Sequence, residues 1–324
     1  MFGGGVPVSA RLALILAVVA VAGIAFQFSL EDDDASPSRC SSASIQAAAV
    51  NVAAARRIYA GELHGRELRI DAGHVRRFRA LLDGLAHGNP AAVRAAVHTI
   101  VYTPRWHIVR LRVISHGRVI ADVGGPSVIA PVSGALRSGG RILGRYVMSV
   151  QDDVGYVKLV TRFIGVPIDL YRGGSFLMGT LTPAPSPGRT GTTVTVGGRN
   201  YFIDVMTMGA FPAGDLKVAL LVPADTASRT SCEAVRVAAW GSIARHLAAR
   251  FKPISSHYQD LVDVLRSTTG GLAYVRSGSS RLAGGATPVR LPGSGTVTYR
   301  GRRWSVYSWE PAPPVRVYLL VPAV

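Results

Sequence analysis

The sequence lacks the short motifs that mark the common classes of enzyme. It contains no phosphate-binding glycine-rich motif and no HExxH, GxSxG or SxxK pattern. Its eight histidines are scattered, and no two of them stand four residues apart on a predicted helix, which argues against a metal site. We therefore expect no catalytic residues, no metal and no cofactor.

Lysine and acidic residues are also scarce, whereas arginine is abundant. Lys158, Lys217 and Lys252 are the only lysines, and 36 basic residues stand against 19 acidic ones, for a formal net charge of +17. Such a charge favours anionic surroundings such as nucleic acid, phospholipid headgroups or an anionic wall polymer. However, no dense basic run is present, and the codon usage of a GC-rich genome gives the same arginine-rich composition. We expect no nucleic-acid partner.

Long apolar runs are absent except near the N-terminus. Residues 12–30 follow Arg11 and are almost entirely apolar. A helix of this length just spans a hydrocarbon core of ~30 Å. The acidic run 31–34 flanks the other end, so the positive-inside rule places residues 1–10 in the cytoplasm and the rest of the chain outside.

We expect residues 11–30 to be a single membrane anchor that is followed by a polar linker at 31–44. The alternative is a cleaved signal peptide, because Ala20-Val-Ala22 provides a small-residue cleavage site. Cleavage would give a secreted protein. No second apolar span follows in the sequence, so the C-terminus is predicted to stay outside.

Helical patterns occupy the region after the linker. Residues 45–63 are alanine-rich, and Asn89-Pro90 provides an N-cap and a first helical residue. Between them, a single helix is predicted from five apolar residues on one stripe, namely Val75, Phe78, Leu81, Leu82 and Leu85. Asp152 and Asp153 could form a carboxylate pair, but their place before residues 154–164 favours capping of a helix there.

Strand patterns follow, and one strand cassette recurs. Strands are predicted at 106–115, 118–123, 128–136 and 142–150. The cassette is a hairpin pattern that leads into a nearly continuous apolar strand. One copy covers 191–224 and another covers 295–323, and both end in Leu-Leu-Val-Pro-Ala. A fainter relative lies at 134–150. Internal repeats of this kind indicate repeated modules.

Three features resemble the extracytoplasmic sensor modules called Cache or PDC domains, whose core is a PAS-like antiparallel sheet. The first is the helix-then-hairpin entry at 271–283, and the second is Ala130-Pro-Val-Ser with the strand at 140–150. The third is the position of a large ectodomain directly after one N-terminal span. The resemblance implies an α+β fold of repeated antiparallel PAS/Cache-like sheet modules with long helices, after one transmembrane helix.

The resemblance also suggests an organisation into three modules. Residues 45–150 would hold helices and a first, short module, 151–224 a second module, and 225–324 a helical connector with a third. Members of the family sense small molecules, often carboxylates or amino acids, and often form dimers. They usually continue through a second membrane helix into a signalling domain. Because this sequence ends before such a helix, we expect a homodimer or a separate signalling partner.

The two cysteines, Cys40 and Cys232, are predicted to pair, because lone cysteines outside the cytoplasm most often do. A bridge across a loop of this length would contribute about 4–5 kcal/mol in the chain-entropy model. It would connect the linker to the junction between the last two modules. The alternatives are two buried free thiols or a bridge between two chains.

Arg110, Arg112, Arg145 and Tyr146 lie on neighbouring predicted strands of the first module. Together they could grip a carboxylate, because the guanidinium fork matches its geometry. The alternative is a set of solvated arginines on an outer sheet face. We therefore predict a membrane-anchored, extracytoplasmic sensor-type domain without catalysis of its own. A cell-envelope scaffold that binds a partner protein or an anionic polymer is the alternative.

Overall fold

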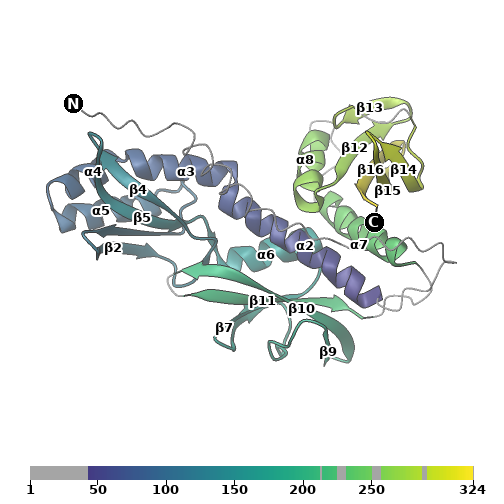
Figure 1. Ribbon diagram of the computed structural model, residues 1–324, viewed down its shortest axis with the longest axis horizontal. Coiled ribbons are helices and arrows are strands. Elements are labelled where there is room, and N and C mark those ends of the chain that lie inside the picture. The colour runs from purple at the N-terminus through teal and green to yellow at the C-terminus, as the bar shows by residue number, and fades with distance from the viewer. Residues whose placement is uncertain (1–42, 212–213, 225–230, 250–256, 287–289, 324) are drawn as a thin grey trace, which may run out of the picture. The chain divides into compact units, whose positions relative to one another are not determined.

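The computed structural model describes residues 43–211, 214–224, 231–249, 257–286 and 290–323. These residues form an α+β fold in which three antiparallel sheets alternate with helices, as the sequence predicts (Figure 1). The expected cytoplasmic tail at 1–10, the anchor at 11–30 and most of the linker at 31–44 lie outside the described residues. Among the described helices, none is both long and apolar enough to cross a membrane.

Four helices precede the first sheet: α2 (Ala43–His64), α3 (Arg66–Arg77), α4 (Arg79–Ala86) and α5 (Pro90–Val101). α5 begins as predicted, with the Asn89 side chain accepting a hydrogen bond of 3.1 Å from the backbone N–H of Ala92. The single helix predicted from the apolar stripe is wrong, because it is split into α3 and α4 at Phe78. The backbone of Phe78 is extended (φ −69°, ψ 103°), and its ring meets Trp106 edge-on.

The first sheet has the strand order β2-β1-β5-β4. Its strands are β1 (Arg110–Ser115), β2 (Arg118–Gly124), β4 (Val132–Ser138) and β5 (Arg141–Ser149). His116 and Gly117 make the predicted turn between β1 and β2, and both have positive φ (49° and 74°). One face of the sheet buries Leu111 and Val113 against apolar residues of α3, α4 and α5.

The strand predicted at 128–136 is two strands that belong to different sheets. β3 (Val128–Ile129) pairs with β6 (Gln151–Asp152) and with a strand of the second sheet, whereas β4 pairs with β5. The break falls at Ala130, whose positive φ of 51° takes the chain out of the extended conformation. Alternation of apolar residues alone did not reveal this change of direction.

The second sheet follows α6 (Asp153–Ile164), which the Asp152 side chain caps by accepting a 2.6 Å hydrogen bond from the N–H of Gly155. The predicted capping is thus confirmed. The sheet runs β6-β3-β10-β11-β7-β8, and β9 pairs with β10. Its longer strands are β7 (Ile168–Arg172), β8 (Ser175–Gly179), β9 (Thr192–Val196), β10 (Arg199–Phe211) and β11 (Asp215–Pro223).

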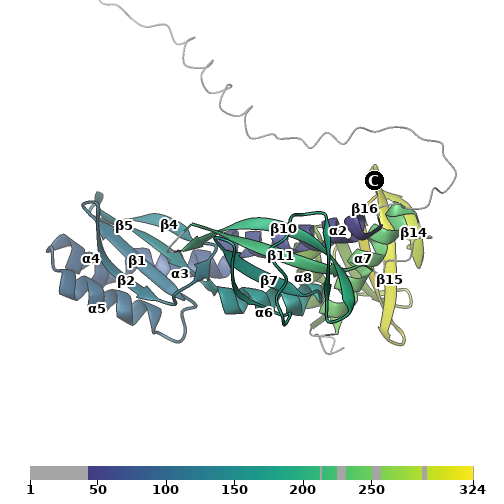
Figure 2. The same cartoon turned by 90° about the horizontal axis from the view of Figure 1, so that it is seen from below.

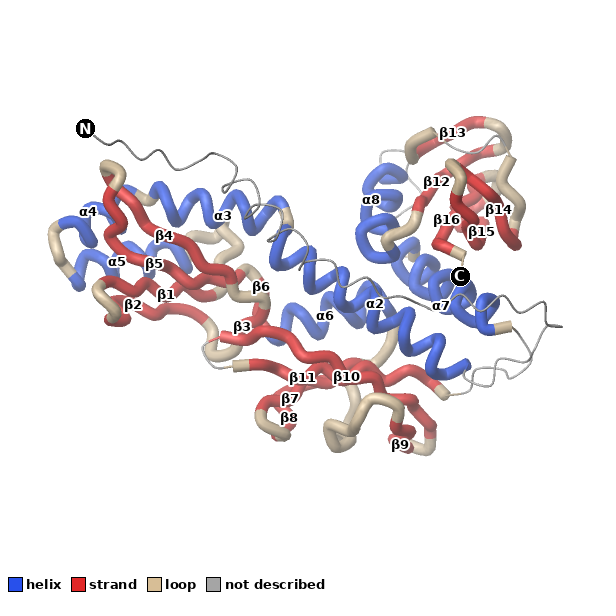
Figure 3. Tube along the Cα trace, in the orientation of Figure 1, coloured by secondary structure: helices blue, strands red, loops and turns tan. Residues whose placement is uncertain are grey.

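The third sheet follows α7 (Cys232–Ala248) and α8 (Tyr258–Thr269), and it runs β13-β12-β16-β15-β14 (Figure 3). Its strands are β12 (Leu272–Ser277), β13 (Ser280–Ala283), β14 (Ser294–Tyr299), β15 (Arg302–Ala312) and β16 (Val315–Pro322). In the second sheet β11 lies between β7 and β10, and in the third sheet β16 lies in the same way between β12 and β15. The repeated cassette therefore has the same topology in both places. The division into three separate modules stays a prediction.

The long helix α2 packs beside β10 and β11 of the second sheet and also beside α6, α7 and α8 (Figures 1 and 2). Val50, Ala54 and Ile58 of α2 are buried in one apolar cluster with residues of all these elements. The alanine-rich sequence of α2 suits this position, because small side chains let neighbouring helices approach closely. α2 thus joins the cores of the second and third sheets.

Candidate functional site

Two of the predicted ligand-binding arginines are already paired with a carboxylate. Arg110 donates two hydrogen bonds to Asp122, of 2.8 Å from Nε and 2.9 Å from Nη2. Arg112 donates two more to the same carboxylate, at 3.0 and 2.6 Å. Both guanidinium groups also lie over the ring of Phe211, at 5.1 and 4.5 Å from its centre. These contacts attach the first sheet to the end of β10.

The other two predicted residues lie on different faces of the first sheet. Tyr146 is opposite Val113 on the buried face and packs against Gly134. A Cβ atom at position 134 would lie only 2.6 Å from the Tyr146 hydroxyl. Arg145 is opposite Ile114 and is exposed. Tyr146 therefore does not share a face with the three arginines. As a ligand site this set stays a prediction, and the geometry gives Arg110 and Arg112 a structural contact.

Cys232 is the first residue of α7, and no described cysteine is a free thiol. Its predicted partner, Cys40, lies outside the described residues, so the pairing stays a prediction. Among the described residues, no three histidine, cysteine or carboxylate side chains gather as a metal site would require.

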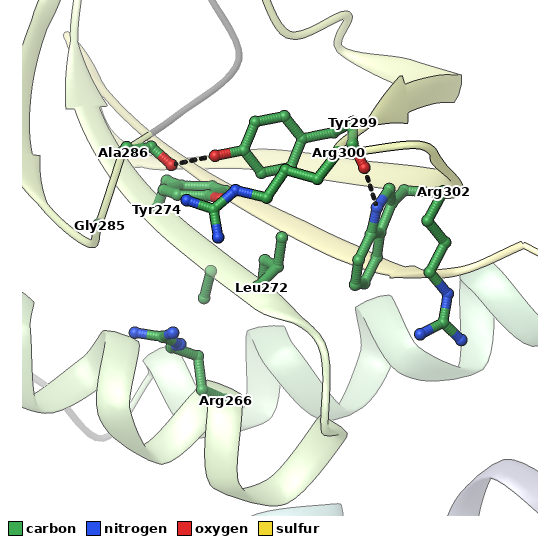
Figure 4. Close-up of a pocket in the computed structure, with 10 residues that line it drawn as sticks. Arg266, Leu272, Tyr274, Gly285, Ala286, Tyr299, Arg300 and Arg302 are labelled. Atoms are coloured by element: carbon green, nitrogen blue, oxygen red, sulfur yellow. Dashed lines mark hydrogen bonds between the residues drawn. The ribbon is translucent and has the colours of Figure 1, made fainter.

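A cavity of about 240 Å³ opens on one face of the third sheet (Figure 4). Leu272 and Tyr274 of β12 and Trp304 of β15 form an apolar and aromatic floor. The walls come from α8, from the segment after β13 and from the turn between β14 and β15. Tyr299 closes one side by donating a 2.9 Å hydrogen bond to the carbonyl of Ala286. The other face of this sheet is covered by α7 and α8.

Three arginines line this cavity, and no carboxylate of the described residues lies within ion-pair distance of Arg266, Arg300 or Arg302. Arg300 occupies the turn with a positive φ of 52°, and its guanidinium lies 5.2 Å from the ring centre of Tyr299. Arg302 lies over Trp304 at the same distance of 5.2 Å. Figure 4 shows Arg266 and Arg300 extending toward the space beside Tyr274, and Arg302 pointing away from it.

Tyr274 is 3% exposed, and its hydroxyl has no hydrogen-bond partner among the described residues. Burial raises the pKa of Tyr274, and the phenol of Tyr299 adds to this effect. Arg266 and Arg300 act in the opposite direction, because their positive charges favour the tyrosinate. The charges of both guanidinium groups therefore act on the Tyr274 hydroxyl at the cavity floor.

The equivalent face of the second sheet is filled by its own chain. Asp169 in the second sheet is equivalent to Tyr274 in the third. Asp169 pairs with Ala219 and Tyr274 pairs with Tyr318, and each of these partners directly precedes the shared Leu-Leu-Val-Pro-Ala. The carboxylate of Asp169 is fully buried and accepts backbone hydrogen bonds from Thr180 and Leu181. The Tyr171 hydroxyl donates a 2.6 Å hydrogen bond to the carbonyl of Pro185. The proline-rich loop at 182–189 thus covers a face that stays open in the third sheet.

Sequence reasoning missed Arg266, Tyr274 and Arg300 as a group. The run Tyr299-Arg-Gly-Arg-Arg-Trp304 lies within the repeated cassette, where arginines of a tight turn look like ordinary solvated residues. Arg266 and Tyr274 lie on either side of the glycines that end α8. Comparison of the two cassettes offers the signal, because the second copy has Arg300 and Trp304 where the first has Gly197 and Tyr201.

No protein-family model matches the sequence, and no curated protein matches it. The fold is similar to that of the periplasmic domain of Vibrio cholerae LuxQ, with 10% identity and a TM-score of 0.35 over 56% of this chain and 99% of that chain. It is also similar to the ligand-binding domain of the Pseudomonas fluorescens chemoreceptor CtaA. The complex with L-alanine has 15% identity and a TM-score of 0.32 over 55% of this chain and 95% of that chain.

The CtaA complex with L-isoleucine gives 14% identity and a TM-score of 0.33 over 56% of this chain and 93% of that chain. At these TM-scores the likeness does not identify a ligand or a site for this protein. The structures found are a periplasmic domain and a chemoreceptor's ligand-binding domain.

Proposed function

We propose that this protein is an extracytoplasmic sensor-type domain that binds a small anion with an apolar body in the cavity of the third sheet. One observation carries the proposal. Arg266 and Arg300 extend toward an aromatic floor, Arg302 lies at its edge over Trp304, and no carboxylate of the described residues pairs with any of the three. Clustered cations of this kind favour a bound anion, and guanidinium groups match carboxylate or phosphate geometry.

The floor of the cavity limits the ligand further. Trp304, Tyr274 and Leu272 provide apolar contact area, so a bare inorganic anion would leave this surface unused. The volume of about 240 Å³ suits a molecule of metabolite size. The Tyr274 hydroxyl and the guanidinium of Arg300 could both donate hydrogen bonds to the same anionic group. The expected ligand is therefore a carboxylate or phosphate attached to a flat or aliphatic body.

The rest of the proposal follows from the N-terminal sequence. Residues 12–30 would anchor the chain in the membrane, with residues 1–10 in the cytoplasm and the described sheets outside. Cleavage after Ala22 would instead release the domain. We assign no catalytic step to the protein, so a signal would require a second copy of the chain or a separate signalling partner.

The same arginines support one other function, the binding of an anionic polymer by a cell-envelope scaffold. Arg300 and Arg302 are exposed at a hairpin end, and such a position can be reached by a large polyanion. The two functions differ in their response to salt and to ligand size. Binding of a polymer through surface charge weakens steeply with ionic strength, whereas binding in a partly enclosed aromatic cavity weakens less.

The test is a thermal-shift screen of the full chain in lipid nanodiscs against organic acids, phosphate esters and inorganic phosphate. A ligand at a hundredfold excess over its Kd stabilises the folded state by about 2.7 kcal/mol. We expect an organic anion to raise Tm while inorganic phosphate at the same concentration does not. If only wall polymer or anionic lipid shifts Tm, and high salt removes the shift, the scaffold function is correct and the sensor proposal fails.

A further inference from the structure

A second cavity of about 420 Å³ lies where α2 meets α7. Ala47 and Asn51 line it from α2, and Gly165 lines it at the end of α6. Val222 of β11 and Ala238 of α7 complete the wall. The cavity shares no lining residue with the one on the third sheet. It is larger than the cavity of about 150 Å³ that holds benzene in an engineered protein core.

The chemistry of this wall differs from that of the arginine-lined cavity. None of the described residues that line it is acidic, basic or a histidine. A charged ligand would therefore lose its hydration without gaining a partner, which is costly. Most of the wall consists of alanine, valine, isoleucine and proline side chains. The cavity thus selects for a neutral and mainly apolar molecule.

Asn51 provides one polar anchor. It is 5% exposed, and its Nδ2 donates a 2.8 Å hydrogen bond to the carbonyl of Ala47 one turn earlier. Its carboxamide oxygen accepts no hydrogen bond from the described residues, although it belongs to a side chain on the cavity wall. This oxygen is not sealed from solvent, so water can reach it from the cavity, and a ligand that brings one donor can take the place of that water.

The position of Asn51 argues against a purely structural role for the open space. The cavity opens to solvent at a rim where Gly165, Pro223 and Ala238 are exposed, and Asn51 lies on its buried side. An apolar side chain at position 51 would fill part of the cavity and leave no acceptor unpaired. The sequence instead places an amide on the inward face of α2, between the buried residues Val50 and Val52.

We propose that the cavity between α2 and α7 is a second binding site, for a small neutral apolar molecule that donates one hydrogen bond to the carboxamide oxygen of Asn51. Alcohols, phenols and indole-like compounds have this chemistry. The proposal does not depend on the anion site, because the two cavities have different walls. A ligand here would contact α2 directly, at Ala47 and Asn51.

The experiment is photolabelling of the full chain in nanodiscs with a neutral trifluoromethyl-phenyldiazirine that carries one hydroxymethyl group. Its methyl ether, which lacks the donor, is the matched control probe. Labelled peptides are identified by mass spectrometry. We expect the alcohol to label the end of β11 and the middle of α7, with about threefold to tenfold more labelling than the ether at equal concentration.

Two variants test the site. Ala238→Trp places a large ring at the exposed edge of the cavity and should abolish labelling there, whereas Ala95→Trp, at an exposed position on α5, should leave it unchanged. Asn51→Leu should remove the preference for the alcohol over the ether. This ratio is measured within one variant, so it remains informative even if Asn51→Leu changes the stability of the protein.

Several results would overturn the proposal. One is equal labelling of the β11 and α7 peptides in the Ala238→Trp and Ala95→Trp chains. Another is an unchanged alcohol-to-ether ratio in Asn51→Leu. Absence of label from these peptides in the unaltered chain would show that lipid or another part of the chain occupies the cavity, and the proposal would fail. Saturation with an anion should not reduce the labelling.

Discussion

Arg110 provides a quantitative test of whether the arginines of the first sheet stabilise the fold or bind a ligand. Its side chain is 13% exposed and makes two hydrogen bonds to Asp122. A third hydrogen bond of 2.6 Å runs from Nη1 to the carbonyl of Gly125, and the guanidinium lies over Phe211. Arg110→Ala removes all of these contacts at once.

The expected loss is about 2 kcal/mol of unfolding free energy. Hydrogen bonds to charged groups contribute about 1.5–3 kcal/mol, and a cation–π contact adds about 0.5–1 kcal/mol. The loss stays below the ~3–5 kcal/mol of a fully orphaned buried charge, because Arg112 still pairs with Asp122 in the variant. For a protein of this size the loss corresponds to a fall in Tm of roughly 3 °C.

The control is Arg145→Ala, because Arg145 is exposed on the same sheet and has no carboxylate partner among the described residues. Its unfolding free energy should change by no more than ~0.5 kcal/mol. Urea unfolding of the full chain, followed by tryptophan fluorescence, measures both variants. An unchanged stability in Arg110→Ala, together with loss of anion binding, would refute this reasoning and support the first sheet as the ligand site.

The effect of Arg110→Ala should also depend on pH. Burial by itself would raise the pKa of Asp122, but the hydrogen bonds and charges of Arg110 and Arg112 outweigh burial and hold this pKa below its usual value. A depressed carboxyl pKa stabilises the fold above the unfolded-state pKa of about 3.9, and the stabilisation is lost as the pH falls through the folded-state pKa. The gap between the unaltered chain and Arg110→Ala should therefore narrow in acid.

Three further predictions follow from other parts of the chain. Burial raises the pKa of Asp169, although the backbone hydrogen bonds from Leu181 and Thr180 act to lower it. The folded state is therefore less stable once the pH has risen through this raised pKa, and Asp169→Asn should raise Tm more at neutral pH than at about pH 4. An equal gain in Tm at both pH values would contradict this. Non-reducing peptide mapping should find Cys40 linked to Cys232, and ready alkylation of both without denaturant would exclude the bridge. Protease added to intact spheroplasts should digest the region after residue 35, and full protection of a C-terminal tag would refute the orientation.

The extent of sequence prediction differs between local and long-range features. Caps and turns were predictable, because the side chain that makes each contact lies within a few residues of its partner. Asn89 and Asp152 both act where the pattern places them. The repeated topology was also predictable, since both cassettes end in the same five residues.

Features that depend on contacts distant in the sequence were not predictable. At the break between α3 and α4, the ring of Phe78 contacts Trp106, and the left-handed backbone at Ala130 leads into a pairing of β3 with β10. Nothing in the arginine pattern of β1 indicated that Asp122, on the next strand, would bind both arginines. The cavity of the third sheet likewise joins residues from α8, β12 and the turn after β14.

The most direct test of the central claim is calorimetric titration of the full chain with the organic anion that the thermal screen identifies. We expect Arg300→Gln to lower the affinity by about tenfold, since one hydrogen-bonded charge contact is lost. Arg290→Gln, which changes an exposed arginine outside the lining of the cavity, should leave the affinity unchanged. Unchanged affinity in Arg300→Gln, or an equal loss in both variants, would contradict the assignment of the third sheet as the ligand site.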